Sequence, residues 1–123
     1  MMSGIKYDEQ KPQMALIPPE AILGLAQVLT FGAAKYSSRN WEQGMLWSRV
    51  FAGVQRHLWA FWSGEDIDEE SGMPHLWCAS AGVAFLVTYQ QRRTGEDDRP
   101  PRQWVDKKET KSVWQRMFNW FRK

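Results

Sequence analysis

Two apolar-periodic segments joined by a short acidic loop constrain the fold of this chain more than any other feature. The first segment covers residues 48–63 and the second covers residues 74–93. Ser48 predicts a capped start for the first helix and Gly64 a left-handed end, while Pro74 suits the first turn of the second helix. The sequence therefore predicts a pair of helices, the first of which spans roughly 24 Å.

Each predicted helix carries one of the two histidines of the chain. The first helix has a stripe of apolar residues at helical spacing: Val50, Val54, Leu58 and Phe61, with Phe51 beside it. His57 follows Val54 by three positions and precedes Phe61 by four, so we expect it to face inward with the stripe. His75 stands at the start of the second helix, next to the acidic loop, and Cys78 and Ala79 follow it on one face.

The loop between the helices concentrates negative charge. Its acids are Glu65, Asp66, Asp68, Glu69 and Glu70. Two carboxylates about 6 Å apart repel by roughly 3 kcal/mol at an effective dielectric near 20, so the cluster either spreads into water or holds a cation. Oxygen ligands with an occasional imidazole suit Mg²⁺ or Mn²⁺, and both histidines flank the loop. A solvated acidic turn and a metal site are both open at this point.

Two further elements are expected before the helical pair. Residues 1–19 are polar and contain prolines, which predicts an ordered arm without a long helix, docked through Leu16 and Ile17. Pro19 and Glu20 then open a helix. Its expected apolar stripe is Ile22, Leu25, Ala26, Leu29 and Ala33.

The segment that follows this helix has no periodicity and is rich in turn-forming residues. It carries Lys35, Arg39, Asn40 and Trp41. Cations neutralise phosphate and an indole face stacks on any base, so the segment could bind a nucleotide. It could equally be a helix connector whose tryptophan packs into the core.

Length and composition favour a single small domain. A chain of 123 residues with one cysteine has no internal disulfide and one hydrophobic core, and no apolar run is long enough to span a bilayer. These features predict a cytoplasmic protein. We expect a domain over residues 1–95, a linker over 96–103 and a basic amphipathic tail helix over 104–123. The aromatic face of the tail is expected to pack on the core or on another protomer rather than to insert in a membrane.

Several phrases, taken in order, resemble one known family. They are KYDEQKPQMALIPPEAI, LTFGAAKYSSRNWEQGM, WSR, RHLWAFWSGEDIDEESGMPHL and AFL, within about residues 5–90. Together they resemble the phage-encoded dATP/dGTP diphosphohydrolase N-terminal family, a divergent branch of the MazG-like nucleotide pyrophosphohydrolases. The resemblance implies an all-α, oligomeric, MazG-like helical bundle with three core helices. It also implies Mg²⁺- or Mn²⁺-dependent hydrolysis of a purine deoxynucleoside triphosphate, dGTP or dATP, to the monophosphate and pyrophosphate.

The resemblance, together with what the implied reaction needs chemically, suggests roles for residues of this chain. Glu65 and Asp68, assisted by His75, are expected to hold the metal, and His57 or Glu70 to act as base. The expected substrate ligands are Lys6, Lys11, Lys35, Arg39, Asn40, Trp41 and Arg56. For Arg56 the alternative is a salt bridge to the acidic loop, and for His57 it is a satisfied core histidine. The expected partners are a nucleoside triphosphate and further copies of the chain, in the host cytoplasm of a phage, without stable nucleic-acid binding.

The chain departs from the pattern that the resemblance implies. The MazG-like signature puts two pairs of carboxylates on facing helices, whereas here the two core helices carry none and only Glu65 and Asp68 repeat the spacing of three. Cys78 stands where the family favours histidine, and Gly82 where it favours asparagine. Two other functions are therefore kept: a nucleotide-binding protein without turnover, such as a sponge for a signalling nucleotide, and a helical interaction protein.

Overall fold

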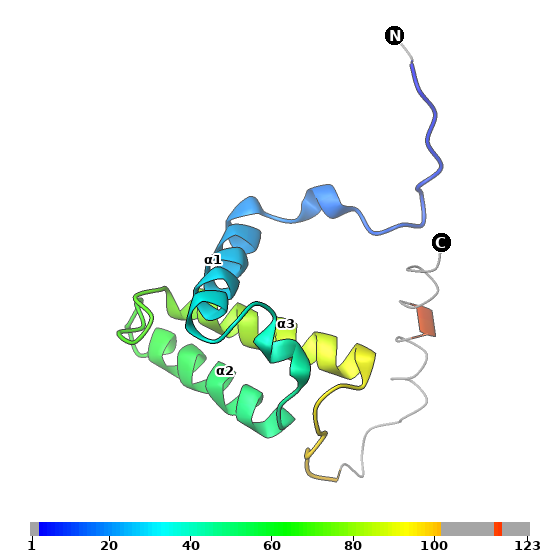
Figure 1. Cartoon of the computed structure of the whole chain (residues 1–123). Helices are drawn as coiled ribbons and strands as arrows, with labels where there is room; N and C mark the ends of the chain where they lie inside the picture. Colours follow the sequence, from blue (N-terminus) through cyan, green and yellow to red (C-terminus); the bar gives the residue numbers. More distant parts are fainter. Residues whose placement is uncertain (1–2, 102–114, 117–123) are drawn as a thin grey trace. The chain divides into compact units, whose positions relative to one another are not determined.

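The protein is all-α in the residues that its computed structural model describes, which are 3–101 and 115–116. Its helices are α1 (Pro19–Lys35), α2 (Trp47–Trp62) and α3 (His75–Arg92), with short 3-10 turns η1 (Met14–Leu16) and η2 (Asn40–Gln43) (Figure 1). The chain divides into two units: residues 18–102 form one, and the two terminal segments belong to the other. Within the described residues, no helix has the length and apolar character needed to cross a membrane.

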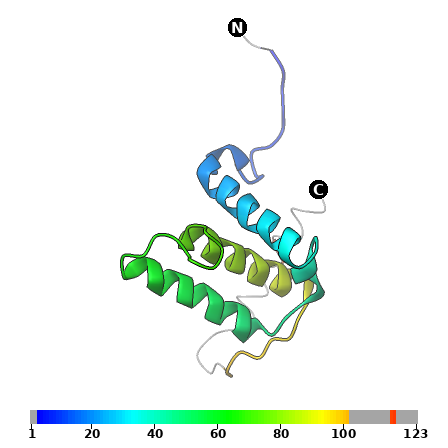
Figure 2. The ribbon, with the colours of Figure 1, turned by 60° about the vertical axis from the view of Figure 1, so that its left-hand side comes forward.

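The three helices form a bundle in which α3 lies between α1 and α2 (Figure 2). α2 and α3 run side by side in opposite directions, joined by the acidic loop (Figure 1). The core cluster consists of Trp47, Val50 and Tyr89, with Trp41, Met45, Phe85 and Leu86 packed around it. This arrangement confirms the predicted all-α fold and the predicted pairing of the two histidine-bearing helices.

Two glycines set how closely the helices approach. A Cβ atom at Gly82 of α3 would collide with the side chain of Val54 on α2. A Cβ atom at Gly24 of α1 would lie 2.6 Å from the indole of Trp77 on α3. Because a real Cβ does not tolerate such a contact, both helix pairs depend on the missing side chain.

The predicted helix ends are correct to within one residue, but one predicted cap is wrong. Gly64 follows the end of α2 and has a positive φ of +100°, as predicted. Pro74 is the residue before α3 rather than part of its first turn, and His75 is the first helical residue. Ser48 does not cap α2, because the helix already begins at Trp47. The N-cap residue is Leu46, and no side chain caps the helix from that position.

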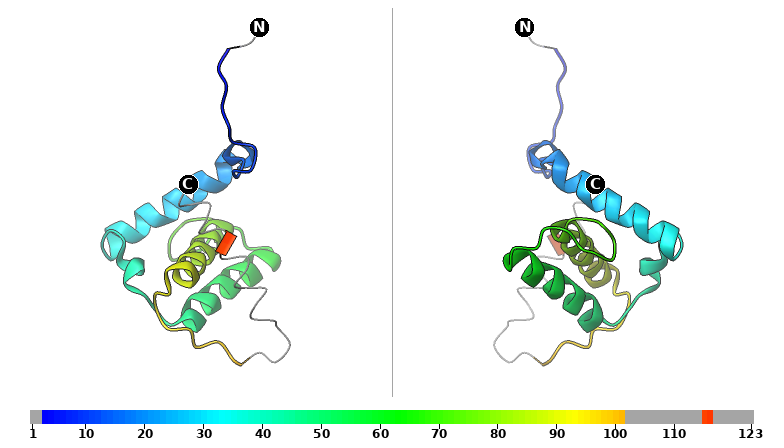
Figure 3. Two further views of the ribbon diagram at one scale, coloured as in Figure 1. Left: turned by 90° about the vertical axis from the view of Figure 1, so that its right-hand side faces the viewer. Right: turned by 90° about the vertical axis from the view of Figure 1, so that its left-hand side faces the viewer.

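The start of α2 is instead held by a distant segment, residues 94–99, which we name the strap (Figure 3). The backbone N–H of Trp47 donates to the carbonyl of Glu96 at 3.0 Å, and the backbone N–H of Ser48 donates to Asp98 Oδ1 at 2.9 Å. The hydroxyl of Ser48 also donates to Asp98. The first residues of the predicted linker 96–103 are therefore packed against the helical unit.

Several residues of the predicted apolar stripes are exposed. On α2, Val50 and Val54 are buried, but Leu58, Phe61 and Phe51 keep 39%, 37% and 54% of their surface exposed. On α1, Ile22 and Ala26 are exposed and Gly24 is the buried residue. The N-terminal arm belongs to the other unit, so its expected docking through Leu16 and Ile17 stays a prediction. Helical spacing finds an apolar face, whereas burial requires a neighbouring element to cover it.

The predicted tail helix, residues 104–123, lies outside the described residues except for Gln115 and Arg116, which are helical. The expected packing of its aromatic face stays a prediction.

Candidate metal and nucleotide site

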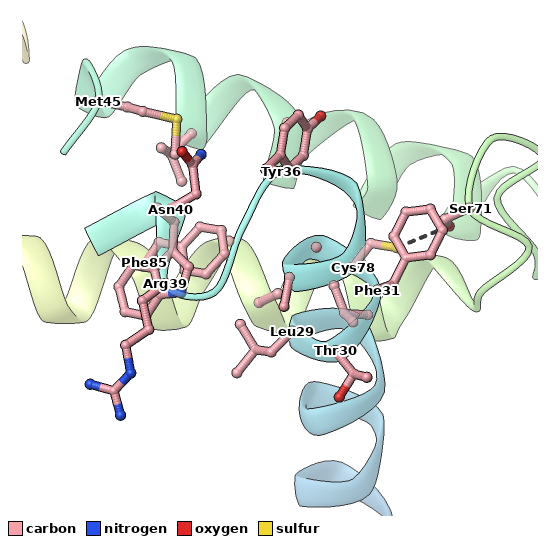
Figure 4. A pocket seen from close by; sticks show the side chains of 18 of the residues that line it. Leu29, Thr30, Phe31, Tyr36, Arg39, Asn40, Met45, Ser71, Cys78 and Phe85 are labelled. Carbon is pink, nitrogen blue, oxygen red and sulfur yellow. Dashed lines mark hydrogen bonds between the residues drawn. The ribbon is translucent and has the colours of Figure 1, made fainter. Parts of the chain in front are cut away.

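A cavity of about 980 Å³ opens between the end of α1, the segment that follows it, α2 and α3. This volume suits a ligand the size of a nucleotide. Its lining includes Phe31, Tyr36, Asn40, Met45 and Phe85, which Figure 4 shows as sticks. His57, Asp68, Ser71 and Cys78 also belong to its wall. The cavity thus brings both predicted functional segments to one place.

Two residues of this wall, His57 and Asp68, lie close to the buried His75. Nδ1 of His57 on α2 lies 2.9 Å from Nδ1 of His75 on α3. One potential ligand atom from each of His57, Asp68 and His75 lies within 4.8 Å of the others. Among the described residues, these three form a group that could hold a metal ion, and it contains His57 where the sequence predicted Glu65.

The loop fixes Asp68 through hydrogen bonds of its own backbone and side chain. The backbone N–H and hydroxyl of Ser71 both donate to Asp68 Oδ2, at 3.0 and 2.6 Å. The backbone N–H of Asp68 donates to the carbonyl of Met73 at 2.8 Å, and that of His75 donates to the carbonyl of Asp66 at 2.9 Å. The acidic loop is therefore a hydrogen-bonded turn that aims one carboxylate at the histidines.

Glu65 contacts the far side of the His75 ring. Its Oε1 lies 3.4 Å from Nε2 of His75, within ion-pair distance. The N–H direction does not meet the criteria of a hydrogen bond, so the buried Nε2 has no hydrogen-bond partner among the described residues. His75 is only 4% exposed. Glu65 thus stands behind one candidate ligand rather than inside the cluster.

Burial and charge set the protonation of the cluster. Burial lowers the pKa of His57, and the charge of Asp68 partly opposes that effect. The hydrogen bond from the Ser71 hydroxyl lowers the pKa of Asp68. Near neutral pH the cluster therefore offers a neutral imidazole at His57 and an ionised carboxylate at Asp68, which are the forms that bind metal ions.

The cationic residues predicted to bind phosphate occupy different environments. Lys35 donates to Glu70 at 3.0 Å, and this hydrogen bond raises the pKa of Lys35. Arg39 is paired with Glu42 at 3.6 Å, and Figure 4 shows its guanidinium pointing away from the other labelled side chains. Arg56 lines the cavity and has no ion pair within the described residues, so the alternative of a salt bridge to the acidic loop is not observed.

The segment after α1 is split between packing and lining roles. The indole of Trp41 stacks on the ring of Phe85, with centroids 4.5 Å apart, and its carbonyl accepts a hydrogen bond from Tyr89. This geometry favours the interpretation of Trp41 as a core-packing residue of the connector, although Trp41 also lines the cavity. Asn40 lines the cavity. Lys6 and Lys11 lie in the N-terminal segment, and their predicted contacts with substrate stay predictions.

Sequence reasoning missed three residues of the cavity wall. Arg49 precedes Arg56 by seven positions, two helical turns, with Gly53 between them, so a basic face was readable from the spacing. Ser71 was not assigned a role, although it holds Asp68. Cys78 was read as a small buried residue; it lies 3.7 Å from the Ser71 hydroxyl, and burial raises the pKa of its thiol (Figure 4).

Comparison with known proteins agrees with the resemblance noted in the sequence. The family described as "dATP/dGTP diphosphohydrolase, N-terminal" matches residues 2–99. A protein named dATP/dGTP diphosphohydrolase, from Salmonella phage PMBT28, is 36% identical over 98 residues, which are 80% of this chain and 33% of that protein. The chain thus spans about a third of the length of this relative. No solved structure matches the chain. The chain belongs to the dATP/dGTP diphosphohydrolase N-terminal family.

Proposed function

We propose that this protein hydrolyses a purine deoxynucleoside triphosphate, dGTP or dATP, to the monophosphate and pyrophosphate in a metal-dependent reaction. The observation that carries the proposal is a nucleotide-sized cavity whose wall holds His57, Asp68 and two arginines of α2, with the buried His75 directly against His57. Family membership and the name of the phage relative support the same reaction class.

The cluster is the part of the cavity suited to the reacting phosphate. A divalent ion bound by these residues would supply positive charge at the attacked phosphorus and lower the pKa of a nearby water molecule. Asp68 contributes the negative charge that such an ion needs, and Ser71 keeps that carboxylate oriented. The three residues come from α2, the loop and α3, so the fold of the α2–α3 pair presets their spacing.

Cationic side chains of α2 are suited to the remaining phosphates. Arg49 and Arg56 both line the cavity, and their spacing of seven residues separates their Cα atoms by roughly 10 Å along the helix. Gly53 lies between them and leaves the helix surface open. Guanidinium groups bind phosphate oxygens in pairs and absorb the charge of a leaving pyrophosphate. Arg49 is an addition to the residues predicted from the sequence.

Of the two predicted bases, Glu70 is compatible with a metal role for His57. If Nδ1 of His57 binds the ion, that nitrogen is not available to accept a proton. Glu70 is close enough for its charge to raise the pKa of His57, and its pair with Lys35 ties it to the end of α1. We therefore assign the role of proton acceptor to Glu70. Lys35 is assigned the role of holding Glu70 in position through their ion pair.

The decisive experiment is a panel of deoxynucleoside and ribonucleoside triphosphates with Mn²⁺ or Mg²⁺, analysed for monophosphate and pyrophosphate. We expect pyrophosphate release from at least one purine deoxynucleoside triphosphate, and none after chelation of the metal. A folded protein that releases no pyrophosphate from any of these nucleotides would contradict the proposal.

A second candidate is nucleotide binding without turnover. The observation in its favour is that α2 and α3 carry no carboxylate, so within the described residues the cluster has a single acid, Asp68. Isothermal titration separates the two functions: a nucleotide that binds tightly in the presence of metal and is recovered intact supports the binding protein.

A further inference from the structure

The ligand set of the cluster is richer in nitrogen than an Mg²⁺ site. Two of its three candidate ligands are imidazoles, from His57 and His75, and one is the carboxylate of Asp68. Mg²⁺ is bound in proteins by oxygen atoms and keeps several waters, whereas imidazole suits Zn²⁺, Co²⁺ and neighbouring first-row ions. The chemistry of the donors therefore favours a different class of ion from the Mg²⁺ that the acidic loop alone suggests.

The spacing of the two imidazoles fits one shared ion. Their Nδ1 atoms are 2.9 Å apart, a distance at which neutral rings share a single proton. Metal–imidazole bonds are about 2.0–2.1 Å long, so one ion could reach both nitrogens once the ring that carries the shared proton holds it on Nε2 instead. Because α2 and α3 approach closely at Gly82 and Val54, the helices preset this spacing before any ion binds.

Glu65 completes the arrangement from behind His75. A histidine that binds metal through one ring nitrogen usually donates its other N–H to a carboxylate or carbonyl, which fixes the tautomer and the ring orientation. Glu65 Oε1 lies 3.4 Å from the buried Nε2 of His75. That nitrogen has no hydrogen-bond partner among the described residues. With its proton on Nε2, His75 presents the Nδ1 lone pair to the cluster.

We propose that His57 Nδ1, His75 Nδ1 and the Asp68 carboxylate form a site that binds Zn²⁺ or Co²⁺ more tightly than Mg²⁺, with Glu65 as the residue that orients His75. The proposal rests on the same cluster as the proposed function but concerns binding of the ion alone. Its test needs no nucleotide, so it stands or falls independently of turnover.

The test is titration of the full chain, in the absence of nucleotide, with Co²⁺, Zn²⁺ and Mg²⁺. Calorimetry measures the affinities, and the visible absorption of Co²⁺ reports its ligands. We expect one ion per chain, with Kd for Zn²⁺ and Co²⁺ at least about 100-fold below that for Mg²⁺. Equal affinity for the three ions would overturn the proposal.

Variants identify the ligands. His57→Ala should weaken Co²⁺ binding about 100-fold or more, and Glu65→Gln about 10-fold, because ligands matter more than the residues that orient them. Glu69→Gln changes an exposed acid of the same loop and is the matched control, expected to bind like the parent. Far-UV circular dichroism checks that each variant is folded. If His57→Ala is unfolded, His57→Gln replaces it in the titration.

Two results would contradict this ligand set. A folded His57 variant that binds Co²⁺ like the parent would remove His57 from the site. A sulfur-to-cobalt absorption band that disappears in Cys78→Ala would assign the ion to the neighbouring thiol instead.

Discussion

The protein contains two short acidic segments that look alike in composition and behave differently in the structure. The acidic loop, residues 65–70, carries Asp68 to the two histidines and leaves Glu65 against His75. In the strap, residues 94–99, one acid accepts hydrogen bonds from the start of α2 and another accepts them from Arg99. The loop lies beside a cavity, whereas the strap replaces a missing helix cap.

The difference lies in what each carboxylate satisfies. In the strap, Asp98 accepts hydrogen bonds from Ser48. Asp97 accepts three from Arg99: one from the backbone N–H at 3.2 Å and two from the guanidinium at 2.8 and 2.7 Å. The guanidinium of Arg99 in turn lies 4.9 Å from the ring centre of Trp47. In the loop, Asp68 takes its hydrogen bonds from Ser71 of the same turn and faces the imidazoles. A carboxylate whose hydrogen bonds are all made to the folded chain stabilises the fold, whereas one that also faces two imidazole rings is available for an ion.

The largest expected effect comes from removing the loop carboxylate of the cluster. Asp68→Asn should lower metal-dependent pyrophosphate release by about 100-fold or more, because it removes the negative ligand of the site. Asp97→Asn, in the strap, is the control and should keep parental activity. Steady-state assays of pyrophosphate, with melting curves for both variants, make the comparison. Equal activities, or an unfolded Asp68→Asn protein, would show that the loop is a structural turn like the strap.

The next effect compares one arginine from each region. Arg56→Gln should weaken binding of a non-hydrolysable triphosphate analogue by about 10-fold, since a charge-assisted hydrogen bond contributes roughly 1.5 kcal/mol or more. Arg99→Gln should leave that affinity unchanged and lower the melting temperature, because Arg99 bonds Asp97 and covers Trp47. Calorimetry and thermal melts measure the two properties. Identical affinities for both variants would exclude Arg56 from the nucleotide site.

A smaller effect is expected from the strap acid that caps α2. The hydrogen bonds from Ser48 lower the pKa of Asp98 in the folded protein below the ordinary value of 3.8. A lowered folded pKa stabilises the protein above the ordinary value, and this contribution is lost as pH falls through the folded pKa. Asp98→Asn should therefore melt at a lower temperature than the parent at pH 7. The gap should narrow as the pH of both melts is lowered from the ordinary value of 3.8 through the folded pKa of Asp98; a gap that stays constant with pH would exclude the carboxylate charge as its cause.

The smallest effect is expected at the exposed ion pair of the strap. Asp97→Asn removes the partner of Arg99, whose hydrogen bond lowers the pKa of Asp97. An exposed pair contributes about 0.5 kcal/mol, so chemical denaturation should find a change of that size or less. A loss several times larger would mean that the strap depends on this pair rather than on Asp98 and the backbone bond of Glu96.

Local sequence signals were enough for the helices. Pro19, Gly64 and Pro74 punctuate the chain, and each predicted boundary at these residues lies within one residue of the observed one. Their effect is local, because a missing N–H or a positive φ acts on the neighbouring turn whatever the rest of the chain does. The inward direction of His57 followed from helical spacing for the same reason.

Contacts between residues far apart in the chain were not predicted from the sequence. The cap of α2 was assigned to Ser48 on local grounds, but its partner, Asp98, lies 50 residues away. Leu58 and Phe51 belong to an apolar stripe, yet they keep 39% and 54% of their surface exposed. Glu65 is the first residue of the acidic loop and His57 lies near the end of the preceding helix, and spacing alone does not say which of them faces Asp68.

The sequence by itself determined that residues 19–92 form three helices and carry two histidines beside an acidic loop, because caps, breaks and periodicity are properties of neighbouring residues. The tertiary structure decided which groups meet. Close packing at Gly82 brings His57 and His75 to 2.9 Å, and the hydrogen bonds of the loop turn Asp68 toward them while Glu65 stays behind the ring. Such distances depend on how whole helices pack, which no local pattern encodes.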